Sequence, residues 1–312
     1  EILMNFLFII GGLLLLIFGG NWLLKAAVAL SLKLNIPKIV IGMTVVSFAT
    51  SAPELIVSLK AALNGAPDLA LGNVIGSNIA NLGFVLGVTL LFGAMKIQKS
   101  FYQTDWPVMM LASGLLYFFL TGDQVIVRYE GIILFSLLVL FLVYLLRFQK
   151  TSFEEDLPEV EVVLSVSYML FYLGIGGVGL WAGSELLVEG AKAMAEDFGV
   201  SQRVIGVTVV SVGTSIPELS ASIIAVIKKE KAISLGNLIG SNIFNILAVL
   251  GITSIVTPVA VSDLGLLSND IFWMLGVSFL ILPLVLLPKR FQLNWKHGFV
   301  MLVLYGIFIY RT

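Results

Sequence analysis

The chain contains no cysteine and only one histidine, His297. The lack of cysteine excludes disulfide bonds and thiolate metal sites, although it says little about the cellular compartment. Soft metals prefer thiolate or imidazole ligands, so the near absence of both argues against a site for such a metal. A cation bound by this chain would therefore be held by oxygen atoms.

Charged residues are also scarce, at 12% of 312 residues, whereas 59% are hydrophobic. Soluble proteins are about 25% charged and about 45–50% apolar, so the composition predicts an integral membrane protein whose surroundings are the lipid bilayer. The alternating strands of an outer-membrane barrel are absent, so all-α spans are expected. The net charge of −1 suggests no nucleic-acid partner, and nothing in the sequence implies a protein partner.

A bilayer core requires about 20 apolar residues per helix, and ten segments meet this requirement. They are residues 4–31, 39–63, 69–93, 105–121, 126–147, 162–195, 203–227, 233–257, 268–288 and 292–310. The first and sixth are long, so both are expected to be tilted. The polar connection at 149–161 divides the chain into residues 1–148 and 162–312, with five predicted helices in each part.

The two parts repeat one another. At an offset of 164, residues 40–87 align with residues 204–251 without a gap, and 26 of the 48 positions are identical. The matches include Pro, Glu, Asn, Ser, Thr and Gly, which apolar low-complexity sequence would not reproduce by chance. The sequence therefore predicts an internal repeat.

Loops after the odd-numbered spans carry 12 lysines and arginines, against 5 on the opposite side. The positive-inside rule places the richer side in the cytoplasm, so the linker is cytoplasmic and both termini lie outside. Because each repeat has an odd number of spans, the second would enter the membrane from the opposite face. Such inverted repeats are common in secondary transporters, whose substrate site lies near the midplane at the repeat interface.

Each repeat carries a proline followed by a glutamate inside an apolar segment, in "SFATSAPELIVSLK" (47–60) and "SVGTSIPELSASII" (211–224). Pro53 and Pro217 should free the carbonyls of Ala49 and Gly213 by displacing them from the helical hydrogen bonds. Hydroxyl, amide and carboxylate oxygens surround these positions in the sequence. The candidate ligands are Ser47, Thr50, Ser51, Glu54, Ser77, Asn78 and Asn81 in the first repeat and Ser211, Thr214, Ser215, Glu218, Ser241, Asn242 and Asn245 in the second.

Calcium takes about 6–8 oxygen ligands in an adaptable shell, whereas magnesium demands a tighter octahedron. The donor set therefore favours Ca²⁺ and also suits Na⁺, whose radius is similar. Two carboxylates neutralise either one Ca²⁺ or two Na⁺, so competition for shared ligands provides a physical basis for antiport. A pair of intramembrane glutamates is in itself a functional hypothesis.

The paired TS-x-PEL and GSNI-x-N motifs resemble the alpha-repeats of the calcium/cation antiporter superfamily, and among its members the prokaryotic sodium/calcium exchangers. The resemblance extends over the whole chain and implies alternating access in the plasma (inner) membrane of a prokaryote, with no cofactor. It implies that Glu54 and Glu218 are central ligands and that Ser47 and Ser211 contribute carbonyls. Side-chain oxygens would come from Thr50, Ser51, Ser77, Thr214, Ser215 and Ser241.

Proton-coupled members typically carry Asn where this chain has Ser51 and Ser215, which favours coupling to sodium. Potassium-dependent members have Asp where this chain has Asn245, which argues against potassium dependence. A calcium/proton antiporter remains the alternative among transporters, and a cation channel is a less favoured one. No constellation for an enzyme is evident.

Overall fold

The computed structural model describes residues 2–148, 164–197, 211–287 and 291–311. Among these residues, the regular secondary structure is helical apart from four two-residue strands, which the sequence did not predict. Within the described residues, the helices are α1 (Ile2–Leu34), α2 (Lys38–Ile41), α3 (Ser47–Leu63), α4 (Pro67–Ala80), α5 (Leu86–Phe92), α6 (Trp106–Thr121), α7 (Arg128–Phe148), α8 (Val166–Asp197), α10 (Ser211–Gly213), α11 (Ile216–Ile227), α12 (Lys231–Phe244), α13 (Gly251–Val256), α14 (Ile271–Leu286) and α15 (Trp295–Arg311).

Seven helical stretches of the described chain are long and apolar enough to cross a membrane. They are Met4–Leu34, Lys38–Leu63, Pro67–Phe92, Arg128–Phe148, Val166–Gly190, Lys231–Val256 and Leu266–Leu286. Two further predicted spans correspond to the shorter helices α6 and α15, of 16 and 17 residues. The predicted span at 203–227 is described only from Ser211 onward, and the predicted linker at 149–161 lies outside the described residues.

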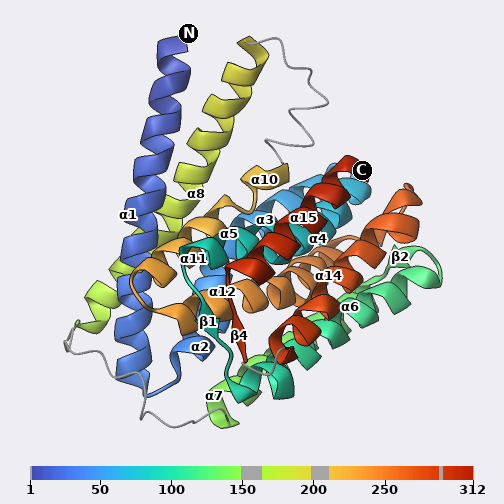
Figure 1. Ribbon diagram of the computed structural model, residues 1–312. Coiled ribbons are helices and arrows are strands. Elements are labelled where there is room, and N and C mark those ends of the chain that lie inside the picture. Colours follow the sequence, from blue (N-terminus) through green and yellow to red (C-terminus); the bar gives the residue numbers. More distant parts are fainter. Residues whose placement is uncertain (1, 149–163, 198–210, 288–290, 312) are drawn as a thin grey trace. The chain divides into compact units, whose positions relative to one another are not determined.

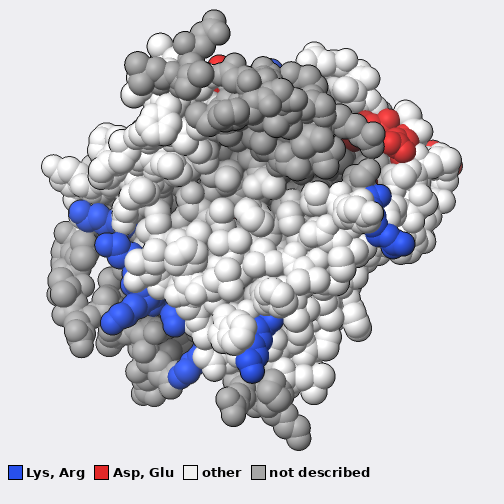
Figure 2. Space-filling view, turned by 45° about the horizontal axis from the view of Figure 1, so that its top comes forward, with Lys and Arg blue, Asp and Glu red and all other residues white. Residues whose placement is uncertain are grey.

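Many large apolar side chains are exposed on these helices, among them Phe118 at 70%, Leu170 at 63% and Phe299 at 61%. On the face shown in Figure 2, most surface atoms belong to uncharged residues. A helix that is apolar on its outward side as well as its inward side is typical of a membrane span. The surface therefore agrees with the composition.

The chain divides into two compact units, the first comprising Glu1–Thr50 and Phe141–Asn237 and the second Ser51–Leu140 and Leu238–Thr312. The boundaries fall within α3, α7 and α12, so each of these helices contributes to both units. In the first unit, α1 and α8 lie side by side (Figure 1). Their backbones approach closely, because a Cβ on Gly12 would lie 2.8 Å from the carbonyl oxygen of Gly183, and one on Gly176 would lie 3.0 Å from that of Gly19.

A second close approach in the first unit joins the segment around Gly42 to α12. A Cβ on Gly42 would collide with the carbonyl oxygen of Ile233, and one on Gly236 with that of Ile39. Glycines of the paired LGN-x-IGSN motifs are expected to permit close helix packing, and Gly236 confirms this expectation. The expectation is wrong for Gly76, where a Cβ would meet no atom of the described chain within 4 Å.

In the second unit, the strands show the same arrangement twice. Strand β1 (Met95–Lys96) pairs antiparallel with β4 (Gln292–Leu293), and β2 (Val125–Ile126) pairs antiparallel with β3 (Val259–Ala260). β3 lies 164 residues after β1, so these two strands are equivalent, and each follows a GSNI-x-N motif. Each pairs with the strand that precedes the last helix of the other repeat, β4 before α15 or β2 before α7. The internal repeat is thus visible in the pairing of these four strands.

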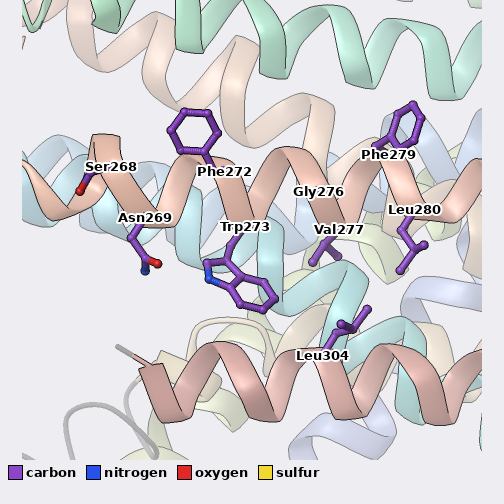
Figure 3. Close-up of a pocket in the computed structure, with 9 residues that line it drawn as sticks. All are labelled: Ser268, Asn269, Phe272, Trp273, Gly276, Val277, Phe279, Leu280 and Leu304. Atoms are coloured by element: carbon purple, nitrogen blue, oxygen red, sulfur yellow. The ribbon is translucent and has the colours of Figure 1, made fainter.

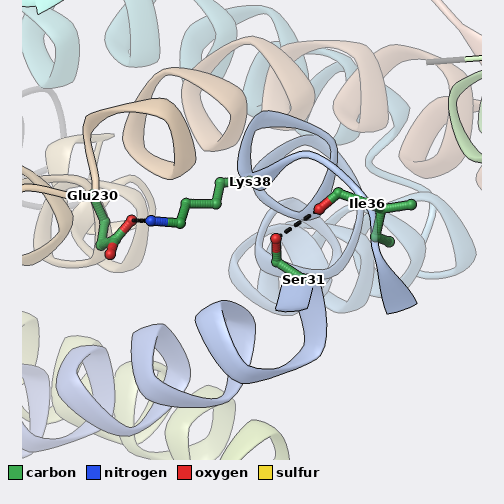
Figure 4. A network of polar contacts seen from close by, with 4 residues as sticks. All are labelled: Ser31, Ile36, Lys38 and Glu230. Carbon is green, nitrogen blue, oxygen red and sulfur yellow. Dashed lines mark hydrogen bonds and ion pairs between the residues drawn. The ribbon is translucent and has the colours of Figure 1, made fainter. Parts of the chain in front are cut away.

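The short connections of the first unit carry one ion pair of the described chain, between Lys38 Nζ at the start of α2 and Glu230 Oε2 just before α12, at 2.8 Å (Figure 4). Nearby, the Ser31 hydroxyl donates to the carbonyl oxygen of Ile36 at 2.7 Å and so ties the end of α1 to the turn before α2. At an offset of 164, the ion-paired residues correspond to Gln202 and Ala66. The other repeat therefore cannot form this ion pair.

Replacing Lys38 with Ala is expected to lower the melting temperature of the purified protein by only about 2–3 °C, because a partly exposed ion pair contributes about 1 kcal/mol or less. Lys33→Ala, at an exposed lysine in the last turn of α1, is the control and should leave the melting temperature unchanged. A loss above about 10 °C in Lys38→Ala alone would contradict this reading, because it would assign to the pair more energy than such pairs contribute.

Candidate functional site

The two proline-containing motifs differ in the structure. α3 runs through Pro53 without interruption, so the break predicted in the first repeat is wrong. The second motif is interrupted at Thr214 and Ser215, between α10 and α11, and Pro217 lies in the first turn of α11. Proline is tolerated in a first turn because its missing N–H would have no helical partner there.

The Gly213 carbonyl, which Pro217 frees, accepts a hydrogen bond from another helix. The Ser184 hydroxyl of α8 donates to the carbonyl oxygen of Gly213 at 2.7 Å. The repeat position of Ser184 is Gly20, so α1 cannot supply this bond to the first motif. Ser184 thus satisfies the freed oxygen, as buried carbonyls require, and the sequence did not single it out because its importance depends on a contact between helices.

Both glutamates of the motifs are buried, Glu54 at 1% exposure in the second unit and Glu218 at 0% in the first. The buried residues of the described chain include four carboxylates but no lysine or arginine. A carboxylate at membrane depth is costly and marks an ion or proton pathway by default. Two of the four, Glu54 and Glu218, belong to the repeated motifs, so each unit holds one motif glutamate as a candidate charge for a cation.

In the second unit, three of the four asparagines of the GSNI-x-N motifs lie together. The amide nitrogens of Asn78 and Asn242 each donate to the other residue's backbone carbonyl oxygen, both at 3.2 Å, and the Asn245 amide donates to Asn78 Oδ1 at 3.1 Å. Asn78 and Asn242 are separated by 164 residues. Equivalent residues of the two repeats thus exchange equivalent hydrogen bonds, as expected across a local twofold axis.

Several buried oxygens of these motifs have no hydrogen-bond partner among the described residues: Ser77 Oγ, Asn81 Oδ1, Asn242 Oδ1 and Asn245 Oδ1 in the second unit and Ser215 Oγ in the first. Most buried polar atoms of proteins are hydrogen-bonded, so such exceptions require an explanation. All belong to predicted ligands. Neutral oxygens beside a carboxylate are a suitable donor set for Ca²⁺ or Na⁺.

The backbone around these asparagines is unusual as well. Asn81 begins a π-helical segment, Asn81–Val85, and Asn245 begins another, Asn245–Leu250. A third such segment, Gly42–Val46, ends immediately before Ser47. π-Helical turns are rare and frequently mark functional sites, so their position at the predicted ligands supports a role for these residues.

In the first unit, the predicted ligands Ser47 and Thr50 contact Asn237, which was not among the predicted ligands. The Ser47 hydroxyl donates to the backbone carbonyl oxygens of Gly42 and Asn237, at 2.9 and 3.0 Å. It is therefore committed to the backbone, which agrees with the expectation that Ser47 offers a carbonyl rather than its hydroxyl. Thr50 Oγ1 lies 3.1 Å from Asn237 Oδ1.

Asn237 and its repeat equivalent, Asn73, each donate a hydrogen bond to a buried serine. The Asn237 amide donates to Ser222 Oγ at 3.2 Å, and the Asn73 amide donates to Ser58 Oγ at 2.9 Å. Both serines are 164 residues apart and fully buried. The identity of these four residues at the repeat offset was the signal that could have identified them.

The remaining predicted ligands, Ser51, Thr214 and Ser241, lie on or beside the motif helices, and Ser51 and Ser241 are buried. Ser211 begins α10, but its side chain lies outside the described part of the chain. The structure thus groups Ser47 and Thr50 in one unit and the asparagines Asn78, Asn242 and Asn245 in the other. It places Glu54 and Glu218 in different units.

A groove of about 430 Å³ on α14 contains none of these residues (Figure 3). It is lined mainly by apolar side chains, including Phe272, Phe279 and Leu304, with Ser268 and Asn269 at one end. Phe272 and Phe279 are more than half exposed. The groove is therefore an outward-facing feature of the apolar surface and not the site of ion chemistry.

Comparison with known proteins agrees with this geometry. The model of the sodium/calcium exchanger protein family matches residues 4–147 and 168–312. The chain is 37% identical to the protein CaxA of Alkalimonas amylolytica over 95% of both chains, and 36% identical to the inner membrane protein YrbG of Escherichia coli over 86% of this chain and 85% of YrbG.

A solved structure of the sodium-calcium exchanger NCX_Mj, soaked with zero Na⁺ and Ca²⁺, is also similar. It has a TM-score of 0.83 and 29% sequence identity, and the match covers 100% of this chain and 99% of NCX_Mj. The chain therefore belongs to the sodium/calcium exchanger protein family, and it is a multi-pass membrane transporter of the calcium/cation antiporter type, not an enzyme.

Proposed function

We propose that this protein exchanges Na⁺ for Ca²⁺ across the membrane by alternating access. One observation carries the proposal: Glu54 and Glu218, at the same position of two repeats, are buried in motifs whose other polar groups are neutral oxygen donors. Two carboxylates balance one Ca²⁺ or two Na⁺, so the two ions compete for the same charge. NCX_Mj is named a sodium-calcium exchanger, which supports the same substrates here.

The proposed ligands are those that the motifs predict. Glu54 and Glu218 supply the charge, and Ser47 and Ser211 supply backbone carbonyls. Neutral side-chain oxygens come from Thr50, Ser51, Ser77, Asn78, Asn81, Thr214, Ser215, Ser241, Asn242 and Asn245. The buried and unpartnered oxygens of Ser77, Asn81, Ser215, Asn242 and Asn245 in the described chain support this assignment.

We propose coupling to sodium and not to protons, and independence from potassium. Ser51 and Ser215 replace the asparagines typical of proton-coupled relatives, and each offers a neutral hydroxyl oxygen to Na⁺. Asn245 provides no third carboxylate to balance an additional K⁺. Its amide is engaged with Asn78 Oδ1, which leaves its carbonyl oxygen oriented as the ligand.

The proposed architecture is ten spans in two inverted five-helix repeats, 1–148 and 162–312, in the plasma (inner) membrane of a prokaryote with both termini outside. The reciprocal bonds between Asn78 and Asn242 and the two strand pairs support the repeat. The lysine and arginine distribution supports the orientation. The relationship to the inner membrane protein YrbG supports the compartment.

The direct test uses the full chain in liposomes loaded with Na⁺. An outward Na⁺ gradient is expected to drive ⁴⁵Ca²⁺ uptake, because each Ca²⁺ that enters displaces Na⁺ from shared carboxylates. Uptake should cease when a sodium ionophore removes the gradient and should not require K⁺. Protein-free liposomes control for leakage.

Each other result of this uptake experiment would overturn a different part of the proposal. Uptake driven only by a pH gradient would overturn sodium coupling and indicate a calcium/proton antiporter. A requirement for K⁺ would overturn the role assigned to Asn245. Calcium flux without any counter-ion would indicate a channel.

A further inference from the structure

Asn237 connects three helices of the first unit. From its position on α12, it donates to Ser222 on α11 at 3.2 Å and lies 3.1 Å from the hydroxyl of Thr50 on α3. Its backbone carbonyl accepts from the hydroxyl of Ser47 at 3.0 Å. Asn237 is 1% exposed, and Ser222 and Thr50 are fully buried. One residue of the second repeat thus contacts two predicted ligands of the first.

The Asn237 amide has the same orientation as its equivalent in the second unit. Its nitrogen donates to Ser222 Oγ on α11, and its oxygen accepts from the Thr50 hydroxyl. In the second unit, the Asn73 nitrogen likewise donates to Ser58 Oγ, at 2.9 Å, and the Ser58 hydroxyl lies 3.4 Å from the carbonyl oxygen of Ala70. Because a serine hydroxyl has one proton, a serine that donates to a carbonyl can only accept from the asparagine.

Two acceptor oxygens lie close to the Thr50 hydroxyl. Its oxygen is 3.1 Å from Asn237 Oδ1 and 3.3 Å from the carbonyl oxygen of Ser47. Helical threonines commonly donate to a carbonyl of the preceding turn. A hydroxyl hydrogen directed at the Ser47 carbonyl oxygen would repel a cation bound to that oxygen. A hydrogen directed at Asn237 Oδ1 leaves the Ser47 carbonyl oxygen and the lone pairs of Thr50 Oγ1 available to the cation.

We propose that Asn237 is a positioning residue whose Oδ1 accepts the hydrogen bond of the Thr50 hydroxyl, so that Thr50 Oγ1 and the Ser47 carbonyl oxygen can both bind the cation. This inference rests on the proposed function, since it takes Thr50 and Ser47 as ligands. Asn237 itself does not touch the ion. Through Ser222 it also ties the ligand turn of α3 to α11, the helix that carries Glu218.

The test is a double-mutant cycle on cation binding by the purified full chain. Affinities for Ca²⁺ and Na⁺ are measured separately from the rise in melting temperature with ion concentration. Thr50→Val and Asn237→Ala are each expected to weaken binding of the affected ion by about tenfold, the effect of one hydrogen bond or ligand. The double variant should remain about tenfold weaker instead of about a hundredfold, because both changes remove the same ligand.

Two additional variants keep the test interpretable. Asn237→Leu preserves the side-chain volume but lacks the acceptor, so it replaces Asn237→Ala if the smaller residue prevents folding. Ser222→Ala removes the partner that orients the amide and should weaken binding less, with no effect in the Thr50→Val background. Ser113→Ala in α6, where the buried hydroxyl bonds the Met109 carbonyl, is the control and should leave both affinities unchanged.

Additive losses in the double variant would overturn the inference, and so would normal ion affinity in both Asn237 variants. Neither result would bear on sodium coupling, because the cycle measures binding and not exchange. Conversely, wild-type protein that transports calcium only with protons would refute the proposed coupling, while the cycle could still be evaluated on Ca²⁺ affinity.

Discussion

Glu54→Gln and Glu218→Gln are each expected to abolish calcium exchange while leaving the protein folded. Both side chains are buried, at 1% and 0% exposure, and glutamine preserves their shape but not their charge. The carboxylate and a bound Ca²⁺ would form a buried pair of opposite charges, and loss of one partner from such a pair costs about 3–5 kcal/mol. This corresponds to a reduction in Ca²⁺ affinity of about a hundredfold or more. Exchange in liposomes at micromolar Ca²⁺ should fall to background.

Melting experiments separate this loss from unfolding. Without Ca²⁺, either variant should melt at or above the wild-type temperature, because a buried carboxylate is costly when no cation is bound. With Ca²⁺, the wild-type protein should be stabilised and the variants should not. Glu189→Gln, on an exposed position of α8, is the matched control and should retain exchange. Normal transport in both single variants would refute the ligand assignment.

Gly176→Ala is expected to lower the stability of the protein. A Cβ at this position of α8 would lie 2.6 Å from the backbone nitrogen and 2.9 Å from Cα of Leu23 in α1, and backbone atoms cannot rotate away. Such overpacking costs about 1–3 kcal/mol, so the melting temperature should fall by roughly 3–8 °C. A bulkier residue, as in Gly176→Leu, should prevent α1 and α8 from packing.

The control lies two residues away on the same helix. A Cβ on Gly174 would meet no atom of the described chain within 4 Å, so Gly174→Ala should be neutral or slightly stabilising, because alanine favours helix more than glycine does. Both variants are compared by melting temperature and by yield of monodisperse protein. Equal behaviour of Gly174→Ala and Gly176→Ala would show that the contact between α1 and α8 is not as close as described.

Composition and repetition could predict much of this fold. Apolar length identified seven stretches that the structure shows as membrane-length helices. The offset of 164 identified Asn78 and Asn242 as equivalent residues, and their mutual hydrogen bonds came only from the structure. The candidate ligands were predicted because carboxylates and hydroxyls are rare in such segments. Of the candidate ligands whose side chains are described, all but Thr214 are buried, while their joint coordination of an ion remains a proposal.

Other features could not be read from the sequence, because they depend on tertiary contacts or on small differences in helix geometry. α-Helical and π-helical turns have similar local composition, so the segments beginning at Asn81 and Asn245 gave no signal. Pro53 was expected to interrupt its helix as Pro217 does, but α3 continues through it. Ser184 and Asn237 acquire their significance from partners on other helices.

The π-helical segments extend the repeat from the sequence to the backbone geometry. Each turn of this kind takes up one more residue than an α-helical turn, and Asn81 and Asn245 begin their segments at the same offset of 164. Both repeats therefore accommodate the wider turn at the same motif asparagine. By contrast, Phe101–Asp105 and Leu266–Asp270 are offset by 165, so the connections before them differ by one residue. The two repeats thus differ in the length of a connection but not in where the wide turn begins beside the motif asparagines.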